Sequence, residues 1–284
     1  MQAKKKNCPD AAEAVEKTDA GPDPDNWHKS LRNAGKLGSG RALQGVCSLG
    51  VTAVAARALG AEGLGSLVLL HTGCLGMAQL LRAENWALIV SFGPAALRDK
   101  AGARFRELLR FSFTLDLLSA LLAAAAFVIS FQVIAESRGF SDSIRHYGFA
   151  YGPVAIMVMN LTGSATGVLR LFDRFNWLAV QSAVEPVLRL FGSLVVWYAG
   201  GGLGAFLVVW MLAIVVGRAC LLLPAQRVLR HKGYGGSLRF STASLIRAQP
   251  GLWRFTLGTQ LDSSLRLGYR TLPILLIGAL VGPA

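Results

Sequence analysis

The chain alternates long apolar runs with short charged segments, a pattern typical of helices that cross a membrane. Four runs contain no Asp, Glu, Lys or Arg: Gly63–Leu81, Leu117–Ala135, Tyr147–Leu169 and Gly200–Gly217. About 20 apolar residues, at 1.5 Å of helical rise each, cross a hydrocarbon core of roughly 30 Å. Each of the four runs therefore predicts a membrane span.

Three further segments are apolar but carry or adjoin charges: Ala42–Ala56, Phe175–Ala199 and Arg254–Ala284. The first lies between Arg41 and Arg57, so it can span only if both arginines extend their side chains outwards to the interface. With these three, the sequence predicts an all-α, polytopic membrane helix bundle of about seven transmembrane helices.

The pattern also divides the chain into three parts. Residues 1–40 mix "AKKK" with "GPDPDN" and lack an apolar run, which predicts a disordered, basic cytoplasmic arm and excludes a cleaved secretory signal. Residues 41–251 are predicted to form a six-helix transmembrane half. Residues 252–284 are predicted to be a seventh span, the start of a second half that is missing from this chain.

Composition and charge agree with a membrane protein. The chain is 53% hydrophobic and 16% charged, with a mean hydropathy of +0.46 and a net charge of +13. If seven spans start from a cytoplasmic N-terminus, 22 Lys and Arg fall on the cytoplasmic side and 3 on the other. That alternation is the positive-inside pattern. The charge therefore predicts a multi-pass protein of the bacterial inner membrane with its N-terminus in the cytoplasm, and no nucleic-acid partner.

Motifs for catalysis, metal binding or cofactor binding are not evident. The four cysteines show no C-x-x-C spacing, the four histidines show no H-x-x-x-H spacing, and no Walker A or G-x-G-x-x-G sequence occurs. The predicted outer connections are short, which leaves little room for the site of a glycan enzyme. We therefore expect no enzyme activity, metal or cofactor. His71, within a predicted span, could relay protons, but a packed, neutral histidine is the favoured interpretation.

The segment "NWALIVSFGPAAL" within the predicted inner connection from Arg82 to Arg110 is too short to span and too apolar to be a free loop. It either lies along the membrane interface, which suits Trp86, or packs on the bundle as an inner-face loop. Its apolar run ends at Gly93 and Pro94.

Glu185 and Arg189 lie near the middle of an otherwise apolar predicted span. An arginine side chain reaches only about 6 Å, so Arg189 cannot extend to the interface and must face protein or water. The i, i+4 spacing places both side chains on one helical face with the acid first, the more favourable order. Pro186 frees a backbone carbonyl one turn earlier and predicts a hinge beside a cavity.

The last predicted span carries a similar stripe, because Asp262, Arg266 and Arg270 are spaced i, i+4, i+8. Charged stripes in two spans suggest an aqueous cavity for an anionic ligand, whereas the alternative is a buried network that fixes helix register. Arg218 lies near the inner end of its span and is expected to extend outwards without a functional role. Asp116 is expected to be solvated or paired with a loop arginine.

Three stretches resemble a known family. "FRELLRFSFTLDLLSALLAAAAF", "SATGVLRLFDRFNWLAVQSAVEPVLRLFGSLVVWYAGGGLGAFLVVW" and "FTLGTQLDSSLRLGYRTLPILLIGALVGPA" together resemble the N-terminal half of bacterial polysaccharide-biosynthesis proteins. This family includes O-antigen and related lipid-linked oligosaccharide flippases, in the superfamily of multidrug, oligosaccharidyl-lipid and polysaccharide exporters. The resemblance covers residues 39–284, and "GVLRLFDRF" is its most specific part.

The resemblance implies the N-terminal half of a two-half transporter, a flippase that moves polyprenyl-pyrophosphate-linked oligosaccharides across the inner membrane for polysaccharide or lipopolysaccharide biosynthesis. It implies that Arg189, Arg266 and Arg270 bind the pyrophosphate and that Glu185 and Asp262 couple transport to a cation. The expected partners are the lipid-linked oligosaccharide, the lipid bilayer, and a C-terminal half or second membrane subunit.

The chain departs from this family where Leu272 and Pro273 replace a commonly acidic residue. "VAARALGAEGLG" and "LLIGALVGPA" form a weak internal repeat, which suggests that the seventh span opens the second half. Two alternatives to a flippase remain open at this stage: an inactive fragment or scaffold of a glycan-assembly complex, and a membrane-embedded glycan-processing enzyme.

Overall fold

The computed structural model describes residues 24–98, 102–137, 139–241, 243 and 251–262, and their side chains from residue 42 onward. These residues form helices joined by short connections, and no strand occurs among them. Five helical segments are long and apolar enough to cross a membrane: Ala42–Leu97, Ala103–Ser137, Asp142–Leu171, Phe175–Tyr198 and Leu203–His231. The prediction of an all-α, polytopic bundle is confirmed. Each of the six spans predicted before residue 251 overlaps one of these segments over its whole length or over all but its first or last few residues.

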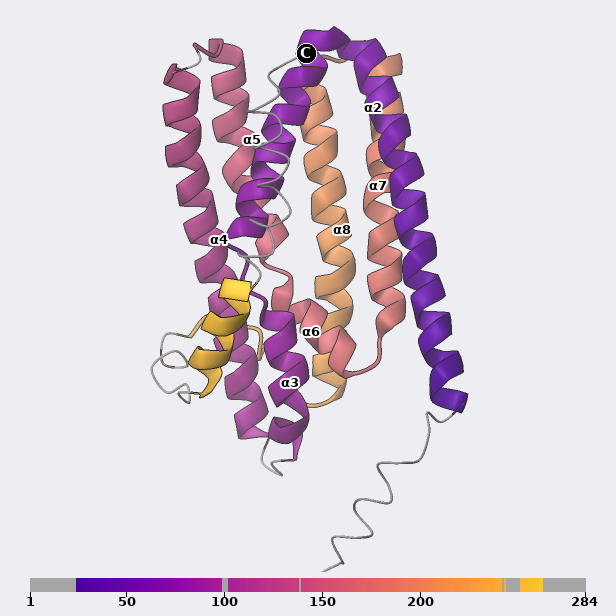
Figure 1. Cartoon of the computed structure of the whole chain (residues 1–284), viewed down its shortest axis with the longest axis vertical. Helices are drawn as coiled ribbons and strands as arrows, with labels where there is room; N and C mark the ends of the chain where they lie inside the picture. The colour runs from indigo at the N-terminus through magenta and orange to yellow at the C-terminus, as the bar shows by residue number, and fades with distance from the viewer. Residues whose placement is uncertain (1–23, 99–101, 138, 242, 244–250, 263–284) are drawn as a thin grey trace, which may run out of the picture.

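The first of these segments folds back on itself. Helix α2 (Pro24–Leu80) leaves helical geometry at Gly60, where φ is 69° and ψ is −174°. Glycine suits this position because side chains with a Cβ rarely adopt such a positive φ. The two arms of α2 meet at the top of the bundle in Figure 1. They correspond to the first two predicted spans, and the helical start at Pro24 lies within the arm predicted to be disordered.

Helix α3 (Asn85–Leu97) is the segment "NWALIVSFGPAAL", which was expected either to lie along the membrane interface or to pack on the bundle as a loop. Leu88 and Ile89 are fully buried against the bundle, so the segment packs on the other helices, as the second interpretation expected, but as a helix. Its Pro94 lies inside the helix, which continues to Leu97. Pro94 is the tenth residue of this 13-residue helix, so its missing N–H removes one hydrogen bond to the carbonyl of Val90 near the end of the helix without ending it.

The predicted span Tyr147–Leu169 is two helices, α5 (Asp142–Asn160) and α6 (Gly163–Leu171). Figure 1 shows α3 and α6 together in the lower part of the bundle, beneath the second arm of α2 and beneath α5. Helix α4 (Ala103–Ser137) is 35 residues long. It runs beside α3 and α6 in its lower part and beside α5 and the second arm of α2 in its upper part. It begins well before the predicted span Leu117–Ala135, because its first turns pack against α3 rather than against lipid.

Helices α7 (Phe175–Tyr198) and α8 (Leu203–His231) complete the bundle. Residues 251–262 are also helical and contact the lower part of the bundle, where Trp253 packs edge-on against Phe111 and Phe255 against Phe92. The rest of the predicted seventh span lies outside the described residues.

The bundle has two apolar cores. The upper core, near the Gly60 turn, includes Leu67, Phe127, Ile156 and Phe206. The lower core is formed by α3, α6 and the lower parts of α4 and α8; it includes Ile89, Phe105, Val168 and Leu221.

Polar residues fall at the level between the two cores on six of the described helices, α3 to α8. On α4 the lower core ends at Leu115 and the upper core resumes at Ala123, with Asp116 between them. On α8, Arg218 lies between Ile214 of the upper core and Leu221 of the lower core. We call this level the polar layer; its members are Asn85, Asp116, Asn160, Ser164, Glu185 and Arg218.

Candidate functional site

A cavity of about 460 Å³ lies in the polar layer and extends toward the Gly60 end. Both arms of α2, the middle of α7 and the middle of α8 form its walls. Each of these four elements contributes a polar side chain: Ser48, His71, Glu185 and Arg218, respectively. The cavity is therefore a partly open space, lined by both polar and apolar side chains, between helices that are apolar enough to cross a membrane.

The carboxylate of Glu185 is shared by two arginines from different helices. Arg189 Nη2 donates to Glu185 Oε1 at 3.1 Å, the pair predicted from the i, i+4 spacing. Arg218 Nη2 on α8 lies 3.8 Å from Oε2, and Gln181 Nε2 donates to Oε2 at 3.2 Å. The side chains of Glu185, Arg189 and Arg218 keep 16%, 19% and 16% of their surface exposed, so all three remain accessible from the cavity.

Arg189 also donates to His71, with Nη1 3.1 Å from His71 Nε2. Because a guanidinium has no acceptor, His71 Nε2 must be the acceptor, and the ring proton must then lie on Nδ1. That nitrogen is 2.8 Å from the hydroxyl of Tyr151 on α5, to which it donates. These bonds require a neutral, buried histidine that positions Arg189, in agreement with the favoured sequence interpretation.

Trp210 on α8 completes the support for Arg189. The guanidinium lies 4.8 Å from the centre of the indole ring, within the range of a cation–π interaction. The imidazole of His71 meets the same indole edge-on at 4.7 Å. The indole is itself fixed by a 3.3 Å hydrogen bond from Nε1 to Ser193 Oγ on α7. Arg189 is thus held by three side chains from three helices: His71 of α2, Glu185 of α7 and Trp210 of α8.

Charge in the cavity wall does not balance. Two guanidinium groups, Arg189 and Arg218, face one carboxylate, and His71 is neutral, so the wall carries about one excess positive charge. The Nε–H groups of both arginines are buried without a hydrogen-bond partner among the described residues. Arg82, just after α2, also has a buried Nε–H without such a partner. The excess positive charge favours an anionic group in the cavity.

The sequence predictions for the site have mixed outcomes. Glu185, Arg189 and Pro186 all line the cavity, although α7 continues through Pro186 as one helix. Asp262 is exposed at the end of the described helix 251–262 and is not among the residues that line the cavity. Arg266 and Arg270 lie outside the described residues.

Two expectations about single charges are wrong. Arg218 does not extend outwards but turns to Glu185 and the cavity. Asp116 is neither solvated nor paired with a loop arginine; it is fully buried and accepts hydrogen bonds from Asn85 and from Ser164. In both cases the partner lies on another helix, so the position within a single span gave no signal.

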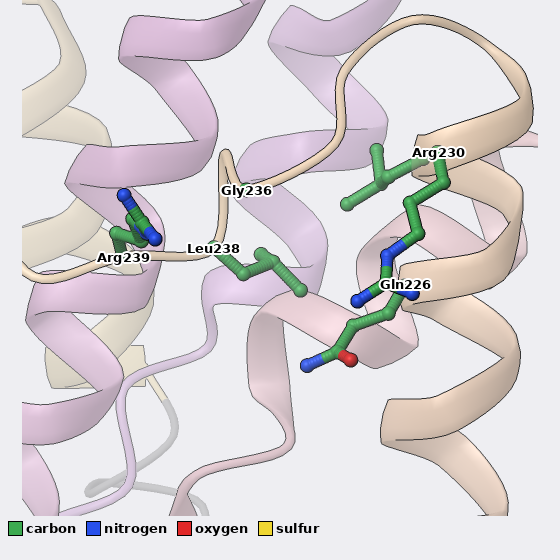
Figure 2. Close-up of a pocket in the computed structure, with 6 residues that line it drawn as sticks. Gln226, Arg230, Gly236, Leu238 and Arg239 are labelled. Carbon is green, nitrogen blue, oxygen red and sulfur yellow. The ribbon is translucent and has the colours of Figure 1, made fainter.

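A second, smaller pocket of about 200 Å³ lies at the lower end of α8. Figure 2 shows Gln226 and Arg230 side by side on α8, with Leu238 of the following segment facing them. Arg239 lies farther along that segment (Figure 2). Both arginines are exposed, as expected for the basic residues that the positive-inside pattern places on one side of the membrane.

Comparison with known proteins gives a consistent fold. No family model matches the chain. Over 254 residues the chain is 27% identical to "Inner membrane protein YghQ" of Escherichia coli. The matched region covers 89% of this chain and 71% of that protein.

The solved structures that the chain matches are transporters. An outward-facing multidrug resistance MATE family transporter of the MOP superfamily aligns with a TM-score of 0.66 and 17% identity, over 88% of this chain and 54% of that one. The inward-facing conformation of such a transporter aligns with a TM-score of 0.53 and 16% identity, over 78% and 50%. These proteins are described as transporters, in agreement with the expectation that the chain is not an enzyme. The chain spans about half of their length, and at these identities the likeness establishes the fold: the chain folds as about half of a MATE-type transporter.

Proposed function

We propose that the chain is one lobe of a multi-pass inner-membrane transporter that binds its substrate in the cavity between α2, α7 and α8. The observation that carries this proposal is the cluster of Glu185, Arg189 and Arg218, which faces a cavity of about 460 Å³ inside apolar helices. Ionisable residues inside membrane spans usually mark a substrate or ion pathway, because a buried charge is otherwise disfavoured. The MATE-type fold and the similarity to an inner membrane protein support the same class and location.

The substrate that we propose is a polyprenyl-pyrophosphate-linked oligosaccharide. The excess positive charge of Arg189 and Arg218, which both line the cavity, suits a pyrophosphate, which a guanidinium can bind through two parallel hydrogen bonds. The resemblance of the "GVLRLFDRF" region to oligosaccharide flippases supports the same substrate class. The matched MATE proteins are described as multidrug transporters; a cationic drug would be repelled by the same excess charge.

Glu185 offers a route for cation coupling in this proposal. Its two carboxylate oxygens are bound by Arg189 and Arg218 in the structure. A pyrophosphate that drew the two guanidinium groups toward itself would release the carboxylate, which could then bind a cation or a proton. Substrate and cation would therefore bind together, as energetic coupling between two sites requires. Arg266, Arg270 and Asp262 remain proposed contributors from the seventh span.

A complete pathway would need a second lobe, either a C-terminal half or a second membrane subunit. The support is that the chain spans about half the length of the solved transporters. No observation on the described residues favours the enzyme or the inactive scaffold over the transporter.

The test is transport in proteoliposomes that contain this chain together with its second lobe. The probe is an undecaprenyl-pyrophosphate oligosaccharide with a fluorescent label, and the readout is its appearance on the opposite leaflet. Arg189→Gln should lower the rate at least about tenfold, equivalent to about 1.4 kcal/mol, because a bidentate contact to phosphate is lost. The matched control is Arg227→Gln, an exposed arginine of α8 outside the cavity. Full transport by an Arg189→Gln, Arg218→Gln double variant would rule out the proposed binding site.

A further inference from the structure

Asp116 lies at a junction where two helices begin. Its Oδ1 accepts from Asn85 Nδ2 at 2.7 Å, and Asn85 is the first residue of α3. Its Oδ2 accepts from the backbone N–H of Ser164 at 2.7 Å, in the first turn of α6. Thr162, the residue before α6, makes no side-chain capping bond. The carboxylate of α4 therefore caps α6 from another helix and anchors the start of α3.

The carboxylate approaches α6 closely because residue 163 is glycine. A Cβ at Gly163 would lie 2.5 Å from Asp116 Oδ1. The same side chain of Asn85 also donates to the carbonyl of Ser112, one turn before Asp116 on α4, at 3.0 Å. Asp116, Asn85, Ser112 and Ser164 thus form one set of residues joined by hydrogen bonds; we call it the junction cluster.

The negative charge of the junction cluster has no partner at contact distance. Asp116 is fully buried, and among the described residues no Lys, Arg or His lies within ion-pair distance of it. The charged group that acts on it is Arg82, from beyond that distance. Two N–H donors and two helix N-termini stabilise the carboxylate, but a full opposite charge next to it is missing.

Two oxygen atoms of the junction cluster lack a partner. Asn85 Oδ1 and Ser112 Oγ are buried without a hydrogen bond, and these residues are at most 1% exposed. The hydroxyl of Ser164 is also buried and can donate to the Asp116 carboxylate. Buried polar atoms in native proteins are nearly always paired, so two orphan oxygens beside one carboxylate indicate an unseen occupant. Asn160, close in sequence to Ser164, has both amide atoms unpaired as well.

The chemistry of these atoms selects the occupant. All are oxygens, the ligands that hard cations prefer, and the set has a single negative charge. A divalent ion would leave an excess positive charge, and a water molecule would satisfy the oxygens but not the charge. A small monovalent cation satisfies both.

We propose that the junction cluster is a binding site for a small monovalent cation, Na⁺ in the first instance, held by Asp116 with Asn85 Oδ1, Ser112 Oγ and Ser164 Oγ. The site is separate from the cavity of Glu185 and does not depend on the proposed substrate. Because its ligands come from α3, α4 and α6, the bound cation ties the two half-length helices to the long one. Binding of this kind stabilises the native state in proportion to the logarithm of the cation concentration.

The test is thermal unfolding of the full-length chain in lipid nanodiscs, in sodium chloride or in choline chloride at the same concentration. Choline is too large to enter a site whose residues are at most 1% exposed. Sodium at about ten times its dissociation constant should raise the unfolding temperature by about 3 °C over choline. Equal unfolding temperatures in the two salts would overturn the proposal.

Two variants locate the site. Asp116→Asn should abolish the sodium-dependent shift, but it could also weaken the fold. Ser112→Ala avoids that difficulty, because removal of an unpaired, buried hydroxyl leaves an empty protein no less stable in choline. With a cation bound, the same variant removes a ligand and should weaken the apparent sodium affinity about tenfold. A shift that is unchanged in Ser112→Ala and in Asp116→Asn contradicts the site.

The control is Glu107→Gln, an exposed acid elsewhere on α4. It should leave the sodium-dependent shift intact, because Glu107 belongs neither to the junction cluster nor to the cavity. Loss of the shift in Glu185→Gln, with the shift retained in Asp116→Asn, would place the cation in the cavity and overturn the proposal. Unfolding is measured without substrate. The sodium test can therefore fail while the transport test succeeds, and the transport test can fail while the sodium test succeeds.

Discussion

The cavity cluster of Glu185, Arg189 and Arg218 and the junction cluster around Asp116 lie in the same polar layer, yet they accommodate charge in different ways. In the cavity, one carboxylate is shared by two long, flexible guanidinium side chains that keep part of their surface exposed. At the junction, one fully buried carboxylate is bound by an amide and by a backbone N–H at the start of a helix.

This difference determines which of the charged groups can change partners. Arginine side chains can rotate toward a ligand, and the cavity provides space for the exchange. The backbone N–H of Ser164 can move only if α6 moves, and Gly163 leaves no space between that helix and the carboxylate. The cavity cluster is therefore suited to binding and release, whereas the junction cluster is suited to holding α3 and α6 in place.

The largest expected effect is at the junction. Asp116→Ala should lower the free energy of unfolding by about 3–5 kcal/mol, because it leaves the Asn85 amide and the α6 N-terminus without an acceptor in a dry site. Gly163→Ala should also lower the free energy of unfolding, since its Cβ would displace the Asp116 carboxylate. The measurement is unfolding in detergent micelles. Glu107→Ala, an exposed acid on the same helix, serves as the control and should show no measurable change. A mild effect of Asp116→Ala would mean that the junction is not an anchor.

The second effect is at the cavity and separates pairing from ligand binding. Glu185→Ala should cost about 2–3 kcal/mol of stability, less than at Asp116, because the arginines left behind are partly exposed to the cavity. A Glu185→Gln, Arg189→Gln double variant should recover most of that stability, as expected for coupled neighbours.

Transport by the double variant then decides the role of Arg189. If Arg189 also binds the pyrophosphate, the double variant recovers expression but not transport, and Arg189→Lys keeps part of the rate because a point charge still attracts phosphate. Translocation is normalised to membrane protein. Full transport by the double variant would reduce the pair to a device that fixes helix register.

The sequence predicted the arrangement of membrane spans well, but it predicted few of the contacts in the polar layer. Length and hydropathy located every span before residue 251, because the hydrocarbon thickness constrains each helix separately. They did not reveal that Tyr147–Leu169 is interrupted, since the break at Leu161 and Thr162 contains no charge and follows no proline. Hydropathy measures the length of an apolar run and not its continuity.

The site was predictable only where both partners lie on one helix. Glu185 and Arg189 follow the helical period, so their pairing could be expected from spacing. Arg218 and His71 join the same cluster from α8 and α2, and Asp116 finds its partners 31 and 48 residues away. Such contacts depend on how helices pack, and the period of a single helix does not encode them.

The smallest expected effect on stability, and the sharpest comparison, comes from Gly217→Ala on α8. The new Cβ would lie 3.0 Å from Glu185 Cβ and from Oε2, a tight contact that a shift of a few tenths of an ångström relieves. The Glu185 carboxylate can rotate into the cavity, but its Cβ moves only with α7, so the two helices must separate by that small shift. Alanine favours the helix over glycine by up to about 1 kcal/mol, which offsets this cost, so stability should change by less than about 1 kcal/mol. The shift nevertheless moves the carboxylate relative to Arg218, which is only 3.8 Å away. Transport should therefore fall several-fold while unfolding is nearly unchanged, the opposite of Gly163→Ala, where the same added methyl group acts on a carboxylate that cannot move. If Gly217→Ala destabilised the protein as much as Gly163→Ala, the two clusters would be equally rigid and the distinction between binding and anchoring would be lost.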